Sequence, residues 1–181
     1  MKIIICRHGD PDYENDSLTE KGRREAKLLA ERISKLDVKS FYISPLGRAK
    51  ATAEPALRKM NRTAEELSWL HEFKGVIMEK GRLVSCWDRK PSYWTAVDSY
   101  YSYEKWTDTP LMKFSNSGSE FKKVAKGLDA LLAKHGYVHN GRYFDAVHPN
   151  HDTIVLFCHF AVEAVIISHI TGISPMPLWH N

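Results

Sequence analysis

Cysteine is scarce in this chain, which has three among its 181 residues, at Cys6, Cys86 and Cys158. The number is odd and no two of them have the C-x-x-C spacing, so the sequence indicates neither a disulfide framework nor a zinc knuckle. Reduced thiols are the default for such a chain, and this favours an intracellular protein, which we expect to be cytoplasmic.

Long apolar runs and long runs of like charge are also missing. The apolar run at Ile3 to Cys6 is too short for a signal peptide, and no stretch approaches the ~20 apolar residues that span a bilayer. Basic residues alternate with Asp and Glu, and the formal net charge is only +4. The composition therefore predicts neither a membrane nor a nucleic acid as partner, although a small positive excess suits a site for small anions.

No internal repeat, low-complexity segment or linker divides the chain. Its length fits one domain and its hydrophobic content of 43% is enough to build a core, so we expect a single domain over residues 1–181. The segment from about 81 to 116 is rich in Trp and Tyr but has no clean period. We interpret this segment as an insertion that lies over the core.

Strand and helix patterns alternate along the rest of the chain. Lys2 to Cys6 has no polar alternation, which is typical of a strand covered on both faces. Thr19 can cap an amphipathic helix, and a second strand at Phe41 to Ser44 leads into Pro45, where we expect the next helix to begin. A later buried strand starts at Thr153 and feeds an apolar helix. This order predicts an α/β fold with a mostly parallel sheet.

Three further elements are expected between these segments. Leu67 to Leu70 has the pattern of an additional short strand. The sequence "SGSE" at Ser117 to Glu120 has the pattern of a capping box before an amphipathic helix. Asn140-Gly141 stands between two strand-like runs and predicts a β-hairpin with a type I′ turn.

Four basic side chains follow the carboxyl ends of the predicted strands. Arg7 and His8 come directly after the first strand, and Arg48 lies in the first turn of the helix after the second. His159 follows the later strand, and residues at such strand ends share one crevice in an open α/β sheet. These groups would repel one another unless an anion sat among them, and a phosphoryl group fits best, because arginine pairs bidentately with its oxygens. Gly9 would let the backbone approach that anion closely.

Several motifs together resemble those of a known family, the histidine phosphatase superfamily, also called phosphoglycerate-mutase-like. They are "RHG" at Arg7, "LTEKGRREA" from Leu18, "SPLGRAKATA" from Ser44, "LHEF" at Leu70 and a strand that ends at His159. Their order and separations are similar to those of the family, over roughly the first eighty residues and the segment from Thr153 to Ile170. The resemblance implies a three-layer α/β sandwich with helices on both faces of a mostly parallel sheet, and it implies no metal or other cofactor.

The resemblance also implies a role for each residue of the site. His8 would be the nucleophile that attacks phosphorus, and Glu72 would protonate the leaving oxygen. Arg7, Arg48 and His159 would hold the phosphoryl oxygens. The expected substrate-binding set is completed by Gly9, Asn15, Ser44 and Phe160. Three other carboxylates remain alternatives to Glu72 as the acid, namely Asp10, Glu79 and Glu163.

Three features depart from the family pattern. Phe160 follows the second histidine where many members have glycine, which alters a backbone approach to phosphate. Glu14 stands where the family often has asparagine after the nucleophile, so we expect the neighbouring Asn15 or another donor to serve instead. Relatives usually continue past "PLW" with further strand structure, so a terminal edge strand either is missing or lies beyond Asn181.

Phosphatases and mutases of this family share the phosphohistidine and differ in whether water or a second substrate hydroxyl accepts the phosphoryl group. This chain is shorter than typical mutase members, and its aromatic segment from Trp87 to Trp106 differs from the usual mutase insertion. We therefore predict a phosphomonoesterase that acts through a phosphohistidine on a small phosphorylated metabolite. Two alternatives remain, a phosphoglycerate-type mutase and a non-catalytic phosphate-binding domain.

The aromatic side chains of this segment allow two interpretations. They could receive an aromatic, nucleotide or sugar group of the substrate. The interpretation that we prefer is that they cover hydrophobic surface.

Overall fold

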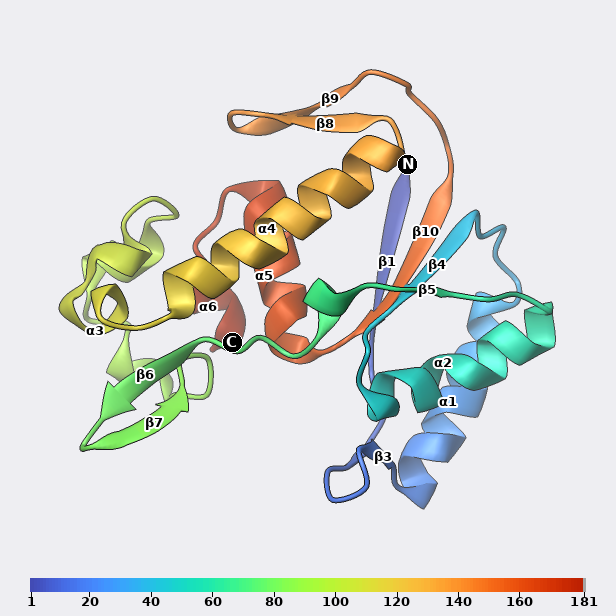
Figure 1. Ribbon diagram of the computed structural model, residues 1–181, viewed down its shortest axis with the longest axis horizontal. Coiled ribbons are helices and arrows are strands. Elements are labelled where there is room, and N and C mark those ends of the chain that lie inside the picture. The colour runs from blue at the N-terminus through green and yellow to red at the C-terminus, as the bar shows by residue number, and fades with distance from the viewer. Residues whose placement is uncertain (181) are drawn as a thin grey trace. The chain divides into compact units, whose positions relative to one another are not determined.

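Four parallel strands form the main sheet of the computed structural model, which describes residues 1–180. In order across the sheet they are β1 (Lys2–Arg7), β10 (Thr153–Cys158), β4 (Ser40–Ile43) and β5 (Glu65–Glu66) (Figure 1). Every neighbouring pair is parallel, which confirms the predicted parallel sheet. The prediction that a terminal edge strand is missing or lies beyond Asn181 falls outside the described residues.

The chain forms two compact units. The first contains residues 1–72 and 149–159, and the second contains residues 73–148 together with the chain from Phe160 onward. The main sheet belongs to the first unit. In the part of the chain that the structure describes, no helix is both long and apolar enough to cross a bilayer.

Two helices pack on the sheet of the first unit. In α1 (Glu20–Ile33) the buried positions Ala26, Ala30 and Ile33 share one face, and in α2 (Gly47–Met60) a row of small residues is buried. Small side chains let the two helices approach each other and the sheet closely. The core between them is built from Cys6, Ala30, Ile33, Val38, Phe41, Ile43, Ala53, Ala56, Val155 and Phe157. The predicted cap of α1 is confirmed, because the Thr19 hydroxyl accepts a hydrogen bond from the backbone N–H of Gly22.

The second helix begins two residues later than the sequence predicted. It starts at Gly47 rather than Pro45, and its N-cap residue Leu46 has no capping side chain. The Ser44 hydroxyl instead accepts a hydrogen bond from the Leu46 N–H, at 3.2 Å. The predicted strand at Leu67 to Leu70 is also displaced, since β5 pairs only Glu65–Glu66 with β4 and Ser68–Leu70 forms a turn of 3₁₀-helix.

A small two-stranded ribbon connects the first strand to the first helix. It pairs β2 (Pro11–Asp12) with β3 (Ser17–Leu18) in antiparallel register. Asp16, at the tip between them, has a backbone φ of 43°. A positive φ is uncommon for a residue with a side chain and occurs most readily at Asn and Asp. The tight turn holds Asp16 in place, which matters for the site described below.

The second unit combines two hairpins with several helices. Its elements are the hairpin of β6 (Val76–Glu79) and β7 (Arg82–Ser85), the helices α3 (Pro110–Lys113), α4 (Ser117–Lys134), α5 (Phe160–Thr171) and α6 (Pro175–Trp179), and the hairpin of β8 (Tyr137–Asn140) and β9 (Tyr143–Ala146). Between β7 and α3 the chain forms only short 3₁₀ turns, at Pro91–Tyr93, Asp98–Tyr101 and Trp106–Asp108.

The aromatic segment contributes to the core of this unit. Trp94, Tyr100 and Trp106 are each no more than 3% exposed. The Trp106 ring packs edge-on against Phe121 and Trp179, with centroid distances of 5.5 and 5.7 Å. These contacts support the interpretation that the aromatic residues cover hydrophobic surface.

Two local details of the second unit differ from expectation. The capping box does not form, because α4 has Asn116 as its N-cap without a side-chain hydrogen bond and Glu120 pairs with Lys123. The β8–β9 hairpin is confirmed, but Asn140 pairs with Tyr143 inside the ladder. The loop is therefore shifted by one residue to Gly141-Arg142, and of these two only Gly141 has a positive φ, so the turn is not type I′.

Gly22 provides a test of the packing between α1 and the loop after β1. A Cβ atom there would lie 2.3 Å from the carbonyl oxygen of Asp10, which is too close without a backbone shift. We expect Gly22→Ala to lower the free energy of unfolding by roughly 1–3 kcal/mol, even though alanine favours a helix by about 1 kcal/mol. Gly118→Ala is the matched control, because a Cβ there meets only the Thr107 side chain, at 3.3 Å from its methyl carbon and 3.7 Å from its Cβ. Equal urea midpoints for the two variants would contradict this packing.

Candidate active site

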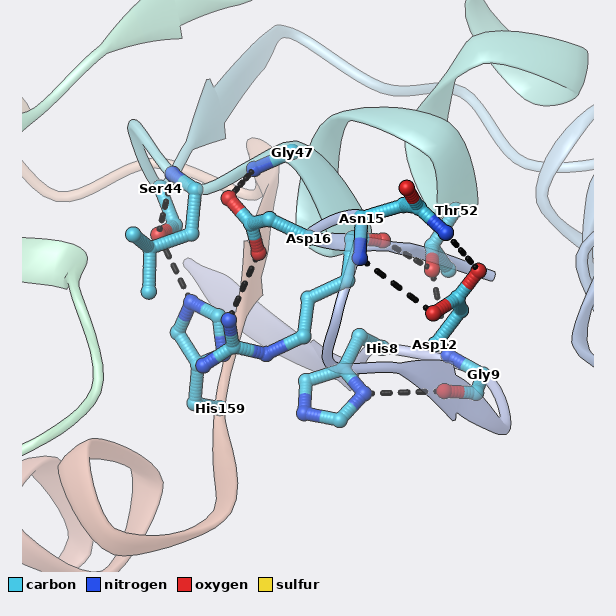
Figure 2. Close-up of polar contacts among 11 residues, drawn as sticks. His8, Gly9, Asp12, Asn15, Asp16, Ser44, Gly47, Thr52 and His159 are labelled. Atoms are coloured by element: carbon cyan, nitrogen blue, oxygen red, sulfur yellow. Dashed lines mark hydrogen bonds and ion pairs between the residues drawn. The ribbon is translucent and has the colours of Figure 1, made fainter. Parts of the chain in front are cut away.

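The two histidines predicted from strand ends lie side by side at one edge of the sheet. In the register of β1 and β10, Arg7 pairs with Cys158, and the backbone N–H of His8 donates to the carbonyl of Cys158 at 3.1 Å. The ring centroids of His8 and His159 are 5.1 Å apart (Figure 2). Parallel pairing of the two strands is therefore what brings these residues together across the sequence.

Glu72 is the candidate acid that joins them. One donor atom from each of His8, Glu72 and His159 lies within 4.8 Å of the others. The alternatives are engaged elsewhere: Asp10 accepts from the Thr19 hydroxyl at 2.6 Å, and Glu79 pairs with Arg89 at 3.1 Å in the second unit. Glu163 lies on α5, also in the second unit.

The hydrogen bond of His8 fixes its tautomer. Its Nδ1 lies 2.8 Å from the carbonyl oxygen of Gly9, and a carbonyl can only accept, so Nδ1 carries the proton. The lone pair is therefore on Nε2. Burial lowers the pKa of His8, and the positive charges of Arg48 and Arg7 lower it further, against the opposing effects of the Gly9 bond and Asp16. The ring is neutral at neutral pH, as a nucleophile must be.

His159 is fully buried and also neutral. Its pKa is lowered to about 3, first by burial and then by the positive charge of Arg48. Nε2 lies 2.7 Å from the Ser44 hydroxyl, which itself accepts a hydrogen bond from the Leu46 N–H. Nδ1 is buried without a hydrogen-bond partner among the described residues. If the Ser44 hydroxyl donates to Nε2, then Nδ1–H is a free donor for an oxygen of a bound anion.

Arg48 is held in the first turn of α2 by a carboxylate that the sequence analysis missed. Its Nη1 donates to Asp16 Oδ1 at 2.7 Å, while Asp16 Oδ2 accepts from the backbone N–H of Gly47 at 2.6 Å (Figure 2). Burial opposes ionisation of Asp16, but the bonds from Gly47 and Arg48 outweigh it and lower its pKa. Arg48 Nε is buried with no partner among residues 1–180, so it remains available to an anion.

Thr52 is a second residue that was missed, although it lies within the quoted motif "SPLGRAKATA". Its hydroxyl accepts from the Gly9 N–H at 3.1 Å and donates to the Arg48 carbonyl at 2.8 Å, which ties the loop after β1 to α2. Gly9 itself is constrained by packing, because a Cβ there would lie 2.9 Å from the carbonyl oxygen of Gly22 on α1. This contact gives a reason for glycine at this position other than close approach to an anion.

The remaining predicted residues have different environments. Arg7 ends β1 with an exposed side chain, and its charge contributes to the lowered pKa of His8. Asn15 is exposed and its amide donates to Asp12 Oδ2 at 2.9 Å. Phe160 is the first residue of α5 and its ring meets Trp87 edge-on in the second unit. The structure thus brings His8, Glu72, Arg48, Ser44 and His159 together, and it turns the Asn15 side chain to Asp12.

The chemistry of the site favours an anion over a cation. The trio of His8, Glu72 and His159 has donor atoms of the kind that bind metal ions. However, the guanidinium of Arg48 acts on both imidazoles and opposes the gathering of further positive charge. An oxyanion that accepts from Arg48 and faces the lone pair of His8 suits these groups better.

Burial of His159 predicts how stability depends on pH. In the unfolded chain this histidine takes up a proton near its ordinary pKa of 6.5, whereas in the native protein the pKa is about 3. Between these values the unfolded state binds more protons, so the free energy of unfolding falls as the pH drops below 6.5 and does not depend on this group above it. We expect a loss of about 2 kcal/mol by pH 5 in urea unfolding.

His159→Asn is the variant that isolates this effect. It removes the titrating group, so its stability should change less between pH 7 and pH 5 than that of the wild type, whatever its stability at pH 7. An unchanged pH dependence in this variant would show that His159 is not the group responsible.

Two curated proteins match part of this sequence. Over 73 residues the chain is 38% identical to a 2,3-bisphosphoglycerate-dependent phosphoglycerate mutase of Thermoplasma acidophilum, covering 34% of this chain and 36% of the mutase. Over 66 residues it is 35% identical to a probable phosphatase of Schizosaccharomyces pombe, covering 32% of each. The matched part is thus about a third of the length of these curated relatives.

Solved structures show the same fold across almost the whole chain. A phosphoserine phosphatase of Entamoeba histolytica, in complex with phosphoserine, has a TM-score of 0.60 at 19% identity and covers 97% of this chain and 82% of its own. The α-ribazole phosphatase of Shigella flexneri has a TM-score of 0.60 at 17% identity and covers 99% and 84%. These likenesses establish an α/β fold with a mostly parallel central sheet flanked by helices.

The family itself follows from a match that does not depend on these pairwise comparisons. The sequence profile of the histidine phosphatase superfamily, branch 1, matches residues 3–181. That range includes both strand-end histidines, Arg48 and Glu72. The match spans almost the whole sequence, so the chain belongs to the histidine phosphatase superfamily, as the motifs predicted.

Proposed function

We propose that this protein is a phosphomonoesterase that acts through a phosphohistidine intermediate on a small phosphorylated metabolite. The observation that carries the proposal is the arrangement of His8, whose unprotonated Nε2 belongs to a neutral ring next to a largely buried arginine and a carboxyl group. We also propose that residues 1–181 make up one catalytic domain, and the profile that spans both units supports this.

Binding of the phosphoryl group would use Arg48 and His159. Arg48 offers its buried Nε, and His159 offers Nδ1–H when Ser44 donates to its other nitrogen. Arg7 adds positive charge from the end of β1. Charge that develops on the phosphoryl oxygens in the transition state meets these preorganised donors, and this is where most of the catalysis of phosphoryl transfer arises.

The reaction would proceed in two steps. In the first, His8 Nε2 attacks phosphorus and forms an N–P bond, the ester P–O bond breaks, and Glu72 gives its proton to the leaving oxygen. In the second, the Glu72 carboxylate takes a proton from water, which attacks phosphorus while the N–P bond breaks. Free phosphate and neutral His8 result, and Nδ1–H remains bonded to the Gly9 carbonyl throughout.

The comparisons support a small phosphorylated substrate without selecting one. The similar structures include a phosphoserine phosphatase, seen both with phosphoserine and with 3-phosphoglyceric acid, and an α-ribazole phosphatase. The identity to the Thermoplasma acidophilum mutase keeps a phosphoglycerate-type mutase as a second candidate. Formation of 2-phosphoglycerate from 3-phosphoglycerate and 2,3-bisphosphoglycerate would identify the mutase, whereas release of free phosphate would identify the phosphatase.

The central test replaces the nucleophile. The wild type should hydrolyse para-nitrophenyl phosphate and carry acid-labile phosphate after a rapid acid quench. His8→Ala should do neither, because no other imidazole has its lone pair in that position. His151→Ala, which changes an exposed histidine, is the matched control and should retain both properties.

Two outcomes of this experiment would overturn the proposal. Acid-labile phosphate that is still trapped on His8→Ala would contradict the assignment of the nucleophile. Absence of turnover in the wild type on a broad panel of phosphorylated metabolites, with phosphate still bound, would indicate a non-catalytic phosphate-binding domain.

Arg48 provides a second, independent test of the site. Arg48→Ala should lower kcat/KM by about 10²–10³, the usual effect of losing one preorganised donor to transition-state charge. Arg58→Ala, at the other end of the same helix and with a side chain that is 78% exposed, is the control and should leave kcat/KM unchanged. A fall of less than about tenfold in Arg48→Ala would place phosphate binding elsewhere.

A further inference from the structure

A second group of metal-binding side chains lies in the second unit, and the proposed reaction does not use it. Asp129 on α4, His139 on β8 and His169 on α5 each contribute a donor atom, and these atoms lie within 4.8 Å of one another. The three residues come from three different elements that pack together. None of them lies in the motifs that resemble those of the histidine phosphatase superfamily.

The distances within the group suit a metal ion. Asp129 Oδ1 lies 2.8 Å from His169 Nε2, and Asp129 Oδ2 lies 3.3 Å from His139 Nδ1. Two ligands that each stand ~2.0–2.1 Å from a tetrahedral zinc ion are about 3.3–3.4 Å apart, so only a small adjustment is needed. The rings of His139 and His169 have centroids 4.6 Å apart, and both imidazoles contact the same carboxylate.

Tyr103 supplies the outer contact that a metal-bound histidine usually has. Its hydroxyl lies 3.0 Å from His169 Nδ1, and His169 is only 7% exposed. Without a metal, His169 Nε2–H donates to the Asp129 carboxylate at 2.8 Å, and Nδ1 accepts from the Tyr103 hydroxyl. Metal binding would use the other tautomer, in which Nδ1–H donates to the Tyr103 hydroxyl and Nε2 offers its lone pair to the ion.

Access to the group is through a pocket of 620 Å³. His139 and His169 line it together with Tyr103, Glu104, Gly141, Arg142, Thr171 and Gly172. The positive charge of Arg142 in this pocket is compensated by Glu104, at 3.2 Å. A hydrated cation can therefore reach the two imidazoles, and three protein ligands leave one coordination position for water.

We propose that Asp129, His139 and His169 form a binding site for a zinc-class divalent cation, with its fourth position open to this pocket. Two imidazole nitrogens and one carboxylate oxygen suit zinc and its neighbours among the transition metals, whereas magnesium and calcium prefer oxygen ligands. Bound metal would link α4, β8 and α5. The competing arrangement is a hydrogen-bonded network in which Asp129 accepts from both histidines and binds no ion.

Zinc affinity can be measured by competition with a chromophoric chelator. Since His8, Glu72 and His159 could also hold Zn²⁺, the experiment uses the His8→Ala background, which removes one donor of that trio. In this background one Zn²⁺ should bind and raise the melting temperature, and Mg²⁺ should not. Tyr103→Phe should weaken binding by roughly 10–100-fold, and His139→Ala should weaken it further because it removes a ligand itself.

Two further variants make the result interpretable. His151→Ala is the matched control, since it removes an exposed histidine of the first unit and should leave zinc affinity unchanged. Asp129→Asn retains the shape of the side chain and tests the carboxylate if His139→Ala does not fold. No Zn²⁺ binding in the His8→Ala background, or an affinity in both His139→Ala and Asp129→Asn that is unchanged from that background, would leave the cluster as a hydrogen-bonded network. Neither result would affect the proposed phosphatase activity, which is assayed in the unmodified chain.

Discussion

The parallel pairing of β1 with β10 is the constraint on which the candidate site depends. Residues 150 positions apart are joined by the bond from the His8 N–H to the Cys158 carbonyl, and the two imidazoles then share one edge of the sheet. A slip of one residue in this register would turn His8 to the opposite face of the sheet. The register is held by consecutive pairs from Lys2–Thr153 to Arg7–Cys158, in which β10 is buried along almost its whole length and β1 is partly buried.

Around these strands the site combines two neutral imidazoles with one fixed positive charge. Burial keeps both imidazoles neutral, while Arg48 provides positive charge beside them. Asp16 compensates that charge and at the same time caps α2, so the guanidinium keeps a fixed position before any ligand is present. Rigid placement of a donor before binding is what lets it stabilise a transition state without further reorganisation.

The sequence predicted the residues that periodicity and strand order control. The buried strand β10, Thr19 as a cap and both strand-end histidines followed from local pattern, and Glu72 followed only from the family motif. The expectation that the first strand is covered on both faces was wrong, because β1 lies at the edge of the sheet and is only partly buried. Asp16 was missed because its role depends on a turn with positive φ, which hydrophobic patterns do not specify. The start of α2 was misplaced for the same reason, since the group that caps Gly47 is distant in sequence.

Burial of the aromatic segment has a consequence for how relatives of this protein can diverge. Trp94, Tyr100 and Trp106 are part of the hydrophobic interior of the second unit, so this segment cannot be exchanged as an independent module. A homologue that received this segment in place of its own would lack the surfaces on which these aromatic rings pack. Natural variation is therefore expected to concentrate at exposed positions such as Tyr101, where a change leaves the interior intact.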